Sequence, residues 1–190
     1  MTSIPILEGF GCRLRPVTVD DAAFIVNLRN QSFAQGMIHA TSASVDRQIQ
    51  WIDNWQRWDN DYYWIIEATG VGGTSIGTIG FYDLEQNLKE GMPGRWVMLP
   101  QNRVNIMAPF LLLYGFVFDE LRFNRVVMDV VATNKKVRRF HELYGARYID
   151  PPPRYLDTEA EVGVPMVWFE FLRDQWPGMN EYWKSVLEVF

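Results

Sequence analysis

The sequence predicts a mixed α/β fold, in which helices cover both faces of one twisted sheet of about 6–7 strands. Two observations carry this prediction. Segments rich in β-branched and aromatic residues alternate along the chain with segments of helical period. Their order is strand, two helices, three strands, helix, strand, helix and strand, which combines hairpins with a helical crossover.

The first third of the chain predicts one strand and two helices. Residues 12–17 alternate between apolar and polar and predict a short strand. Thr18 resembles the first residue of a capping box, which predicts a helix over 19–31. Ser44 suits the N-cap of a second helix over 45–58.

The middle of the chain predicts a β-hairpin followed by a further strand. Residues 62–68 and 76–84 have strand character, and the segment VGGTS at 71–75 between them favours a turn. The segment 87–94, NLKEGMPG, has the composition of a loop. A strand is expected over 95–99, where Pro100 ends it.

The last third of the chain predicts helices over 108–121 and 135–144, strands over 125–131 and 164–171, and a closing helix within 174–190. The long apolar helix joins two strands of one sheet, so these strands should be parallel and the crossover right-handed. Gly145 suits the position that follows the short basic helix.

Composition places the chain among globular proteins and excludes several classes of function. The 190 residues suit one domain over 1–190, with 174–190 as an extension. A net charge of −5 argues against a nucleic-acid partner, because phosphate neutralisation needs an excess of Lys and Arg. One cysteine and two histidines argue against disulfides and a Cys/His zinc site. No apolar run approaches the ~20 residues of a membrane span and no signal peptide is recognised, so we expect a cytoplasmic protein without a membrane partner.

Four segments, in this order, resemble the GNAT superfamily of acyl-CoA N-acyltransferases. They are LRPVTVDDAAFIVNLRN at 14–30, IGTIGF at 76–81, FDELRFNRVVMDV at 118–130 and VATNKKVRRFHELYGA at 131–146. The first two predicted helices look most like the branch that acetylates protein N-termini, as of ribosomal proteins, or amino sugars on nucleotides. The resemblance implies the GNAT fold, with a splayed pair of parallel strands, and acetyl-CoA or another acyl-CoA as co-substrate.

The resemblance also implies where the co-substrate binds. In the family, pantetheine lies between the splayed strands and bonds their backbone as an added strand would. The pyrophosphate meets backbone N–H groups at the start of the next helix. In this chain the strands would be 95–99 and 126–131, and the pyrophosphate turn 101–106. The binding residues so implied are Val97, Met98, Leu99, Gln101, Arg103, Val104, Asn105, Asn134 and Arg139.

The predicted pyrophosphate turn departs from the family pattern, Arg/Gln-x-x-Gly-x-Gly/Ala. Gln101 and Arg103 fit, but Val104 and Ile106 stand where glycines let the backbone approach a phosphate. Acyl-CoA binding is then either retained or lost, and its loss would leave a non-catalytic binding module of the same fold. Residues 122–147 favour retention, since they hold seven basic and two acidic residues, a net charge of +5 against −10 elsewhere. A charged stretch is also typical of a solvated helix face.

Candidate groups for the chemistry lie on the short basic helix and at the end of the hairpin. Direct acyl transfer needs a neutral amine and an acid for the leaving thiolate. Family members often place a tyrosine seven residues after the turn asparagine, Asn134, and that position is His141 here, with Tyr144 one helical turn further on. An imidazole of ordinary pKa suits the acid role, although His141 also fits a surface position near a helix end. Glu85 and Asp83 are candidate bases.

For the acceptor site, the sequence offers several candidate residues and two acceptor classes. His39, between the first two helices, is a further candidate base. Trp51, Trp55 and Trp58 share one helical face, which is typical of core residues but also suits stacking on a sugar or nucleobase. We expect transfer to a primary amine of a small molecule, first of all a nucleotide-linked amino sugar, with a protein N-terminus as the alternative. A homodimer is compatible with the sequence.

Overall fold

The structure is a computed structural model that describes residues 4–34, 38, 42–100, 104–155 and 164–188. Its strands are β1 (Leu7–Gly9), β2 (Cys12–Pro16), β3 (Tyr62–Ala68), β4 (Thr74–Glu85), β5 (Glu90–Met98), β6 (Arg125–Val131), β7 (Arg147–Ile149) and β8 (Met166–Leu172). Its α-helices are α1 (Ala22–Arg29), α2 (Val45–Trp55), α3 (Met107–Gly115), α4 (Lys135–Leu143) and α6 (Trp176–Leu187).

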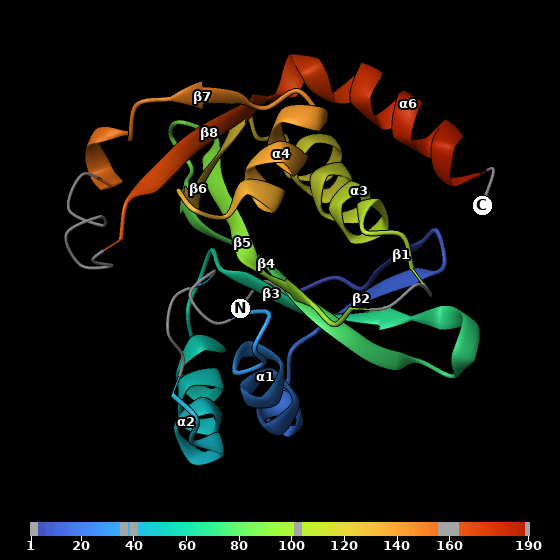
Figure 1. Cartoon of the computed structure of the whole chain (residues 1–190), viewed down its shortest axis with the longest axis vertical. Coiled ribbons are helices and arrows are strands. Elements are labelled where there is room, and N and C mark those ends of the chain that lie inside the picture. The colour runs from blue at the N-terminus through green and yellow to red at the C-terminus, as the bar shows by residue number, and fades with distance from the viewer. Residues whose placement is uncertain (1–3, 35–37, 39–41, 101–103, 156–163, 189–190) are drawn as a thin grey trace.

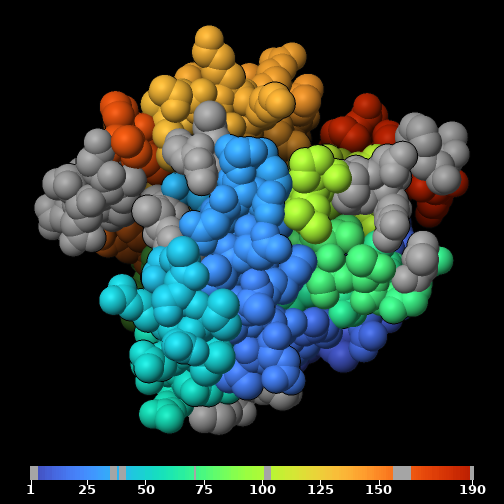
Figure 2. Space-filling model, turned by 60° about the horizontal axis from the view of Figure 1, so that its bottom comes forward, coloured from blue at the N-terminus to red at the C-terminus, as the bar shows by residue number. Residues whose placement is uncertain are grey.

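One mixed sheet organises the molecule, with the strand order β1-β2-β3-β4-β5-β6-β8-β7. Neighbouring strands are antiparallel except for β5 and β6, which are parallel as predicted. Helices α1 and α2 cover one face of the sheet, and α3, α4 and α6 lie on the other (Figure 1). The surface formed by α1 and α2 is shown in Figure 2, in blue and cyan. The mixed α/β prediction is therefore confirmed.

The apolar core lies mainly between the sheet and α3. This helix is apolar on every side because it packs between the sheet and α6, and the π-helical turn Phe116–Glu120 continues it. A smaller cluster joins α1, α2 and β3 around Trp55, which is 2% exposed. Within the described ranges, no helix combines the length and apolarity needed to cross a bilayer.

The predicted helix starts are confirmed by their caps. Asp21 accepts a hydrogen bond from the backbone N–H of Thr18 at 2.8 Å and completes the capping box. Ser44 and Asn134 accept from backbone N–H groups in the first turns of α2 and α4. Gly145 follows α4 with φ of +92°, the left-handed conformation that glycine adopts without strain.

The prediction of a loop over 87–94 is confirmed for 87–89, which form a turn, and is wrong for 90–94, because β5 already begins at Glu90. Gly91 faces Phe81 and Leu84 so closely that a Cβ atom would clash with both side chains. Pro93 pairs with Phe81 of β4, and its missing N–H is tolerated because β5 has an open edge beyond Gly91. Gly91 and Pro93, although typical of turns, are therefore strand residues here, because packing against β4 and the open edge of β5 accommodate them. The short outer strands β1 and β7 were also not predicted.

The feature that creates the site is the early separation of β5 and β6. Within these two strands, which are described in full, the ladder consists of Glu90 with Arg125 and Gly91 with Val126. Bulges in β4 and β5 and the positive φ of Arg95, +50°, turn β5 away from its neighbour. The predicted splayed pair is therefore present, with its closed end at residue 90.

The glycines of β4 generate a prediction about stability. A Cβ atom on Gly77 would lie 2.5 Å from the carbonyl oxygen of Val97 on the adjacent strand, which cannot move without breaking the ladder. Gly77→Ala should therefore lower the free energy of unfolding by about 3 kcal/mol. Gly178→Ala is the control, because a Cβ at this α6 position meets nothing and should stabilise by about 0.5–1 kcal/mol. Urea denaturation of both variants measures the difference, and equal stabilities would contradict the prediction.

Candidate functional site

A cavity of about 930 Å³ opens where β5 and β6 separate. Residues 93–98 of β5 and 128–131 of β6 line it, and side chains of α3 and α4 complete its walls. The facing edges of the two strands have no ladder partner in this stretch. Backbone amides without a partner favour an extended ligand that carries its own amide groups.

Two of the residues predicted on β5 border this cavity. Val97 and Met98 line it. Leu99 does not, and its backbone N–H donates to the carbonyl oxygen of Ile76 at 2.8 Å, on the β4 side. The first two therefore belong to the edge that a ligand can reach.

The predicted pyrophosphate turn is described only in its second half, since Gln101 and Arg103 lie outside the described residues. Val104 is 6% exposed and packs in the core, so its side chain occupies the interior. Asn105 accepts a hydrogen bond from the N–H of Met107 at 2.9 Å and thereby caps α3. Ile106 is exposed and borders the cavity. Burial of Val104 gives a structural reason for valine at this position.

The start of α4 contributes polar groups to the cavity. Asn134 lines it together with Lys135 and Lys136. Arg139 does not border the cavity, and its guanidinium pairs with Glu142 at 3.3 Å on the outer surface. Of the seven basic residues in 122–147, the two lysines are thus the ones that face this cavity.

The predicted catalytic pair, His141 and Tyr144, lies at the C-terminal end of α4. His141 is buried, lines the cavity, and its Nδ1 contacts the hydroxyl of Tyr144. Tyr144 is buried further in, where its hydroxyl oxygen lies 3.1 Å from Met128 Sδ and 3.4 Å from the hydroxyl of Tyr114. The structure therefore brings the two predicted residues into direct contact.

Burial changes the protonation chemistry of this pair. It lowers the pKa of His141 to about 3, so the imidazole is neutral at pH 7. Burial also raises the pKa of Tyr144 well above 10, and the nearby Tyr114 adds to the rise. The expectation of an ordinary imidazole pKa is wrong. A neutral His141 can donate a hydrogen bond from its ring N–H to a leaving thiolate in the cavity, whereas an imidazolium is not available.

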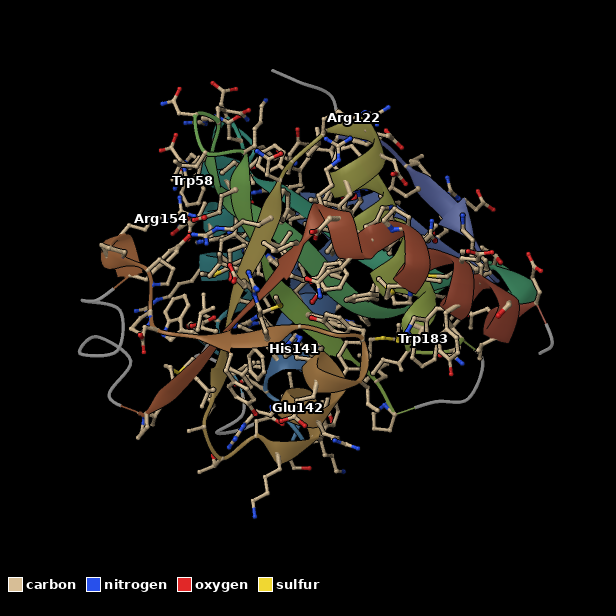
Figure 3. The ribbon with its side chains drawn as sticks, turned by 90° about the horizontal axis from the view of Figure 1, so that it is seen from above. Trp58, Arg122, His141, Glu142, Arg154 and Trp183 are labelled. Atoms are coloured by element: carbon tan, nitrogen blue, oxygen red, sulfur yellow. The ribbon has the colours of Figure 1, made fainter. Side chains whose placement is uncertain are left out.

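A second, more polar cavity of about 720 Å³ lies on the side of the sheet that α2 covers. Its lining residues come from the segment between α2 and β3, the end of β4, β5 and the turn Pro153–Tyr155: they are Trp58, Asp59, Asn60, Asp61, Asp83, Leu84, Arg95, Arg154 and Tyr155. Figure 3 shows Trp58 and Arg154 near one another at one edge of the molecule. We refer to the two cavities as the large and the small cavity.

Arg95 borders both cavities and is held from several sides. Its guanidinium forms two hydrogen bonds with the carboxylate of Asp61, one of them 2.7 Å long. It also lies over three rings, with its central carbon 4.3 Å from the centre of Tyr82, 5.2 Å from Tyr63 and 5.3 Å from Trp51. Such cation–π contacts and a bidentate ion pair fix the guanidinium in one place.

The tryptophan face divides between core and cavity. Trp55 is buried, and its indole N–H donates to Asp61 at 2.9 Å. Trp51 stacks on it at a centroid distance of 6.2 Å. Trp58 is 50% exposed and borders the small cavity. The core interpretation is therefore confirmed for Trp55, and stacking on a ligand stays a prediction for the exposed Trp58.

The candidate bases are separated by the structure. Asp83 borders the small cavity, where burial and the neighbouring Asp61 raise its pKa while Arg154 opposes the rise. Glu85 borders neither cavity and accepts a hydrogen bond from the N–H of Asn87 at 3.0 Å. His39 lies outside the described residues.

Sequence reasoning did not identify Arg95, Asp61 or Tyr82. Arg95 stands in a strand with no motif around it, and its partner Asp61 is 34 residues away. A weak signal is Gly94, because its missing Cβ leaves room for the ring of Tyr82 on β4. That signal has meaning only once the β4–β5 register is known.

Comparisons with known proteins agree with this geometry. The family model described as the acetyltransferase (GNAT) domain matches residues 12–147. Among curated proteins the chain has no match.

Several solved structures are similar. An apo structure of FdhC, a nucleotide-linked sugar GNAT, is 25% identical, with a TM-score of 0.79 over 97% of this chain and 99% of that one. A GCN5-related N-acetyltransferase from Brucella melitensis is 18% identical, with a TM-score of 0.80 over 97% and 86%. The ribosomal-protein-S5-alanine acetyltransferase from Vibrio fischeri is 14% identical, with a TM-score of 0.70 over 90% and 98%.

The neutral, buried His141 generates a prediction about pH. The unfolded chain binds a proton on this residue below about pH 6.5, whereas the folded chain excludes it until about pH 3. Stability should therefore fall as the pH drops through this window, by about 1.4 kcal/mol per pH unit from this residue alone. In His141→Gln, the free energy of unfolding measured by urea between pH 6 and 4 should have a slope shallower by that amount. A slope equal to that of the wild type would show that His141 is accessible to protons.

Proposed function

The chain belongs to the GNAT acetyltransferase family, and on that premise we propose that it acylates the primary amine of a nucleotide-linked amino sugar. Its family and its neighbours make it an N-acetyltransferase, which favours an enzyme over the non-catalytic module that the sequence left open. The observation that carries the proposal is the large cavity between two parallel strands that part after two residue pairs.

The large cavity is the proposed site of acetyl-CoA or another short acyl-CoA. Its open strand edges offer backbone groups to the amides of pantetheine, next to Val97 and Met98. Lys135 and Lys136 supply positive charge at the start of α4, where the helix dipole also favours phosphate. Val104 and Asn105, in the turn before α3, would contribute their backbone groups to this site. Gln101, Arg103 and Arg139 stay predictions from the resemblance.

In the proposed reaction, the neutral amine attacks the thioester carbonyl to form a C–N bond. The nitrogen of the tetrahedral intermediate loses one proton to water, and the C–S bond breaks to release the amide and the thiolate of CoA. His141 lines the cavity and is neutral, so it assists by a hydrogen bond from its ring N–H to the thiolate. Tyr144, in contact with Nδ1, orients the ring. Glu85 stays a predicted base, and Asp83 is the candidate carboxylate that borders a cavity.

The nucleotide-linked amino sugar is favoured as acceptor by likeness and by chemistry. The similar structure of FdhC is that of a nucleotide-linked sugar GNAT and matches nearly the full length of both chains. The small cavity presents an exposed indole beside carboxylates, groups that suit a hydroxylated amine. Thiol release from acetyl-CoA in the presence of nucleotide-linked amino sugars or N-terminal peptides tests this choice, and turnover of peptides alone would contradict it.

Binding of acetyl-CoA to the folded chain should be visible as stabilisation. At a ligand concentration 100 times the Kd, mass action adds about 2.7 kcal/mol to the free energy of unfolding. For a domain of this size that corresponds to a rise in Tm of roughly 5–10 °C. Differential scanning fluorimetry with acetyl-CoA, and with adenosine as a control that lacks the pantetheine arm, measures it. An unchanged Tm at millimolar acetyl-CoA would contradict the proposed use of the large cavity.

The proposed hydrogen bond to the thiolate forms only as the C–S bond breaks. His141→Phe should therefore lower kcat by about 100-fold, the effect of removing one donor to a developing charge, and leave the KM for acetyl-CoA within about twofold. Tyr144→Phe should lower kcat less, because the phenol acts through the imidazole. Steady-state thiol release measures both. Wild-type rates in both variants would remove the pair from the mechanism.

A further inference from the structure

We propose that the small cavity binds the amine-bearing sugar ring of the acceptor, with Trp58, Asp59 and Asp83 as its binding groups, and that the phosphates of the same molecule stay outside. The inference rests on the proposed function, because it places the acceptor of that reaction. It adds the site, the residues and the part of the acceptor that each would contact.

The small cavity is well placed for an acceptor because it adjoins the large cavity, where the acyl-CoA is proposed to bind. Arg95 lines both, so it forms a wall shared by the two spaces. The ion pair with Asp61 and the three rings around the guanidinium hold this wall in place. An acceptor in the small cavity therefore lies next to the large cavity, with Arg95 between the two spaces. Its volume, about 720 Å³, is that of a site for a small ligand.

The charges of the small cavity select against phosphate. Each of its two arginines already has a carboxylate partner: Arg95 pairs with Asp61, and Arg154 pairs with Glu90 at 2.7 Å. Asp59 and Asp83 have no ion pair or hydrogen bond with another described residue. Anionic groups would meet two carboxylates that have no ion-pair partner of their own, whereas hydroxyls and an ammonium group would donate hydrogen bonds to them.

The remaining walls suit a hydroxylated ring. Trp58 is 50% exposed, and an indole face packs well against the C–H face of a sugar or a cationic amine. Tyr155 lines the same cavity and is 6% exposed, and its hydroxyl has no hydrogen-bond partner in the described part of the chain. A buried hydroxyl without a partner is costly. A polar group of the ligand next to it would remove that cost.

The side chains of Asp83 and Trp58 allow a clean test. Asp83 has a φ of +52°, a conformation that asparagine also tolerates, so Asp83→Asn removes charge with little change in shape. Trp58→Ala removes the exposed ring. Asp53→Asn, on the exposed side of α2, and Tyr182→Ala, at an exposed position of α6, are the matched controls.

The experiment uses the full chain with acetyl-CoA and a panel of nucleotide-linked amino sugars. Asp83→Asn and Trp58→Ala should each lower kcat/KM for the amino sugar at least tenfold. The KM for acetyl-CoA and the Tm rise with acetyl-CoA should stay as in the wild type. The inhibition constant of the bare nucleoside diphosphate should remain within about twofold, because its phosphates lie outside the small cavity. The two control variants should match the wild type throughout.

Three outcomes would overturn the inference. Unchanged kcat/KM in both cavity variants would show that the sugar binds elsewhere. A weaker inhibition by the nucleoside diphosphate, parallel to the loss of kcat/KM, would show that the phosphates enter the cavity. Turnover of N-terminal peptides but of no amino sugar would show that the acceptor class is wrong. By contrast, a wild-type chain that acetyl-CoA does not stabilise would contradict the proposed function itself.

Discussion

The architecture depends on the parallel strands β5 and β6, which pair at one end and separate at the other. Glu90 and Arg125 face one another at the closed end, and Glu90 is only 2% exposed. Arg154 adds a second guanidinium to the same carboxylate at 2.7 Å, and Glu170 takes up Arg125 at 3.0 Å. A buried carboxylate that lost these partners would be strongly destabilising, so the closed end is firmly held. The open end follows from bulges in β4 and β5, which turn β5 away.

This arrangement explains how an acidic protein can contain a site for an anionic co-substrate. The basic segment 122–147 does not act as one patch. Arg125 and Arg147 pair with Glu170, and Arg139 pairs with Glu142, so their charge is neutralised within the fold. Lys135 and Lys136 border the large cavity instead. Local charge, set by which side chains already have partners, decides where an anion can bind.

The same reasoning distinguishes the two cavities. One is bordered by open strand edges, apolar rings and two lysines, and the other by carboxylates, an indole and arginines that already have partners. Arg95 separates them, and Asp61 links it to the buried indole of Trp55. The tryptophan-bearing helix therefore acts on the site through one ion pair, as well as through the ring exposed at its end.

The sequence by itself determined the order of elements, the helix caps, the family resemblance and the parallel pair, because these depend on local patterns and on residues near one another in the chain. Through that resemblance it also predicted roles for His141, Val97 and Asn134, which line the large cavity, and for Tyr144, which contacts His141. Only the tertiary structure decided that 90–94 belong to a strand, since the glycines and the proline there are required by side chains on β4 and tolerated at the open edge. Only the tertiary structure showed that His141 is neutral, that Val104 faces the core and that Arg95 stands between two cavities. Burial and long-range ion pairs are properties of the assembled fold, and no local pattern of residues encodes them.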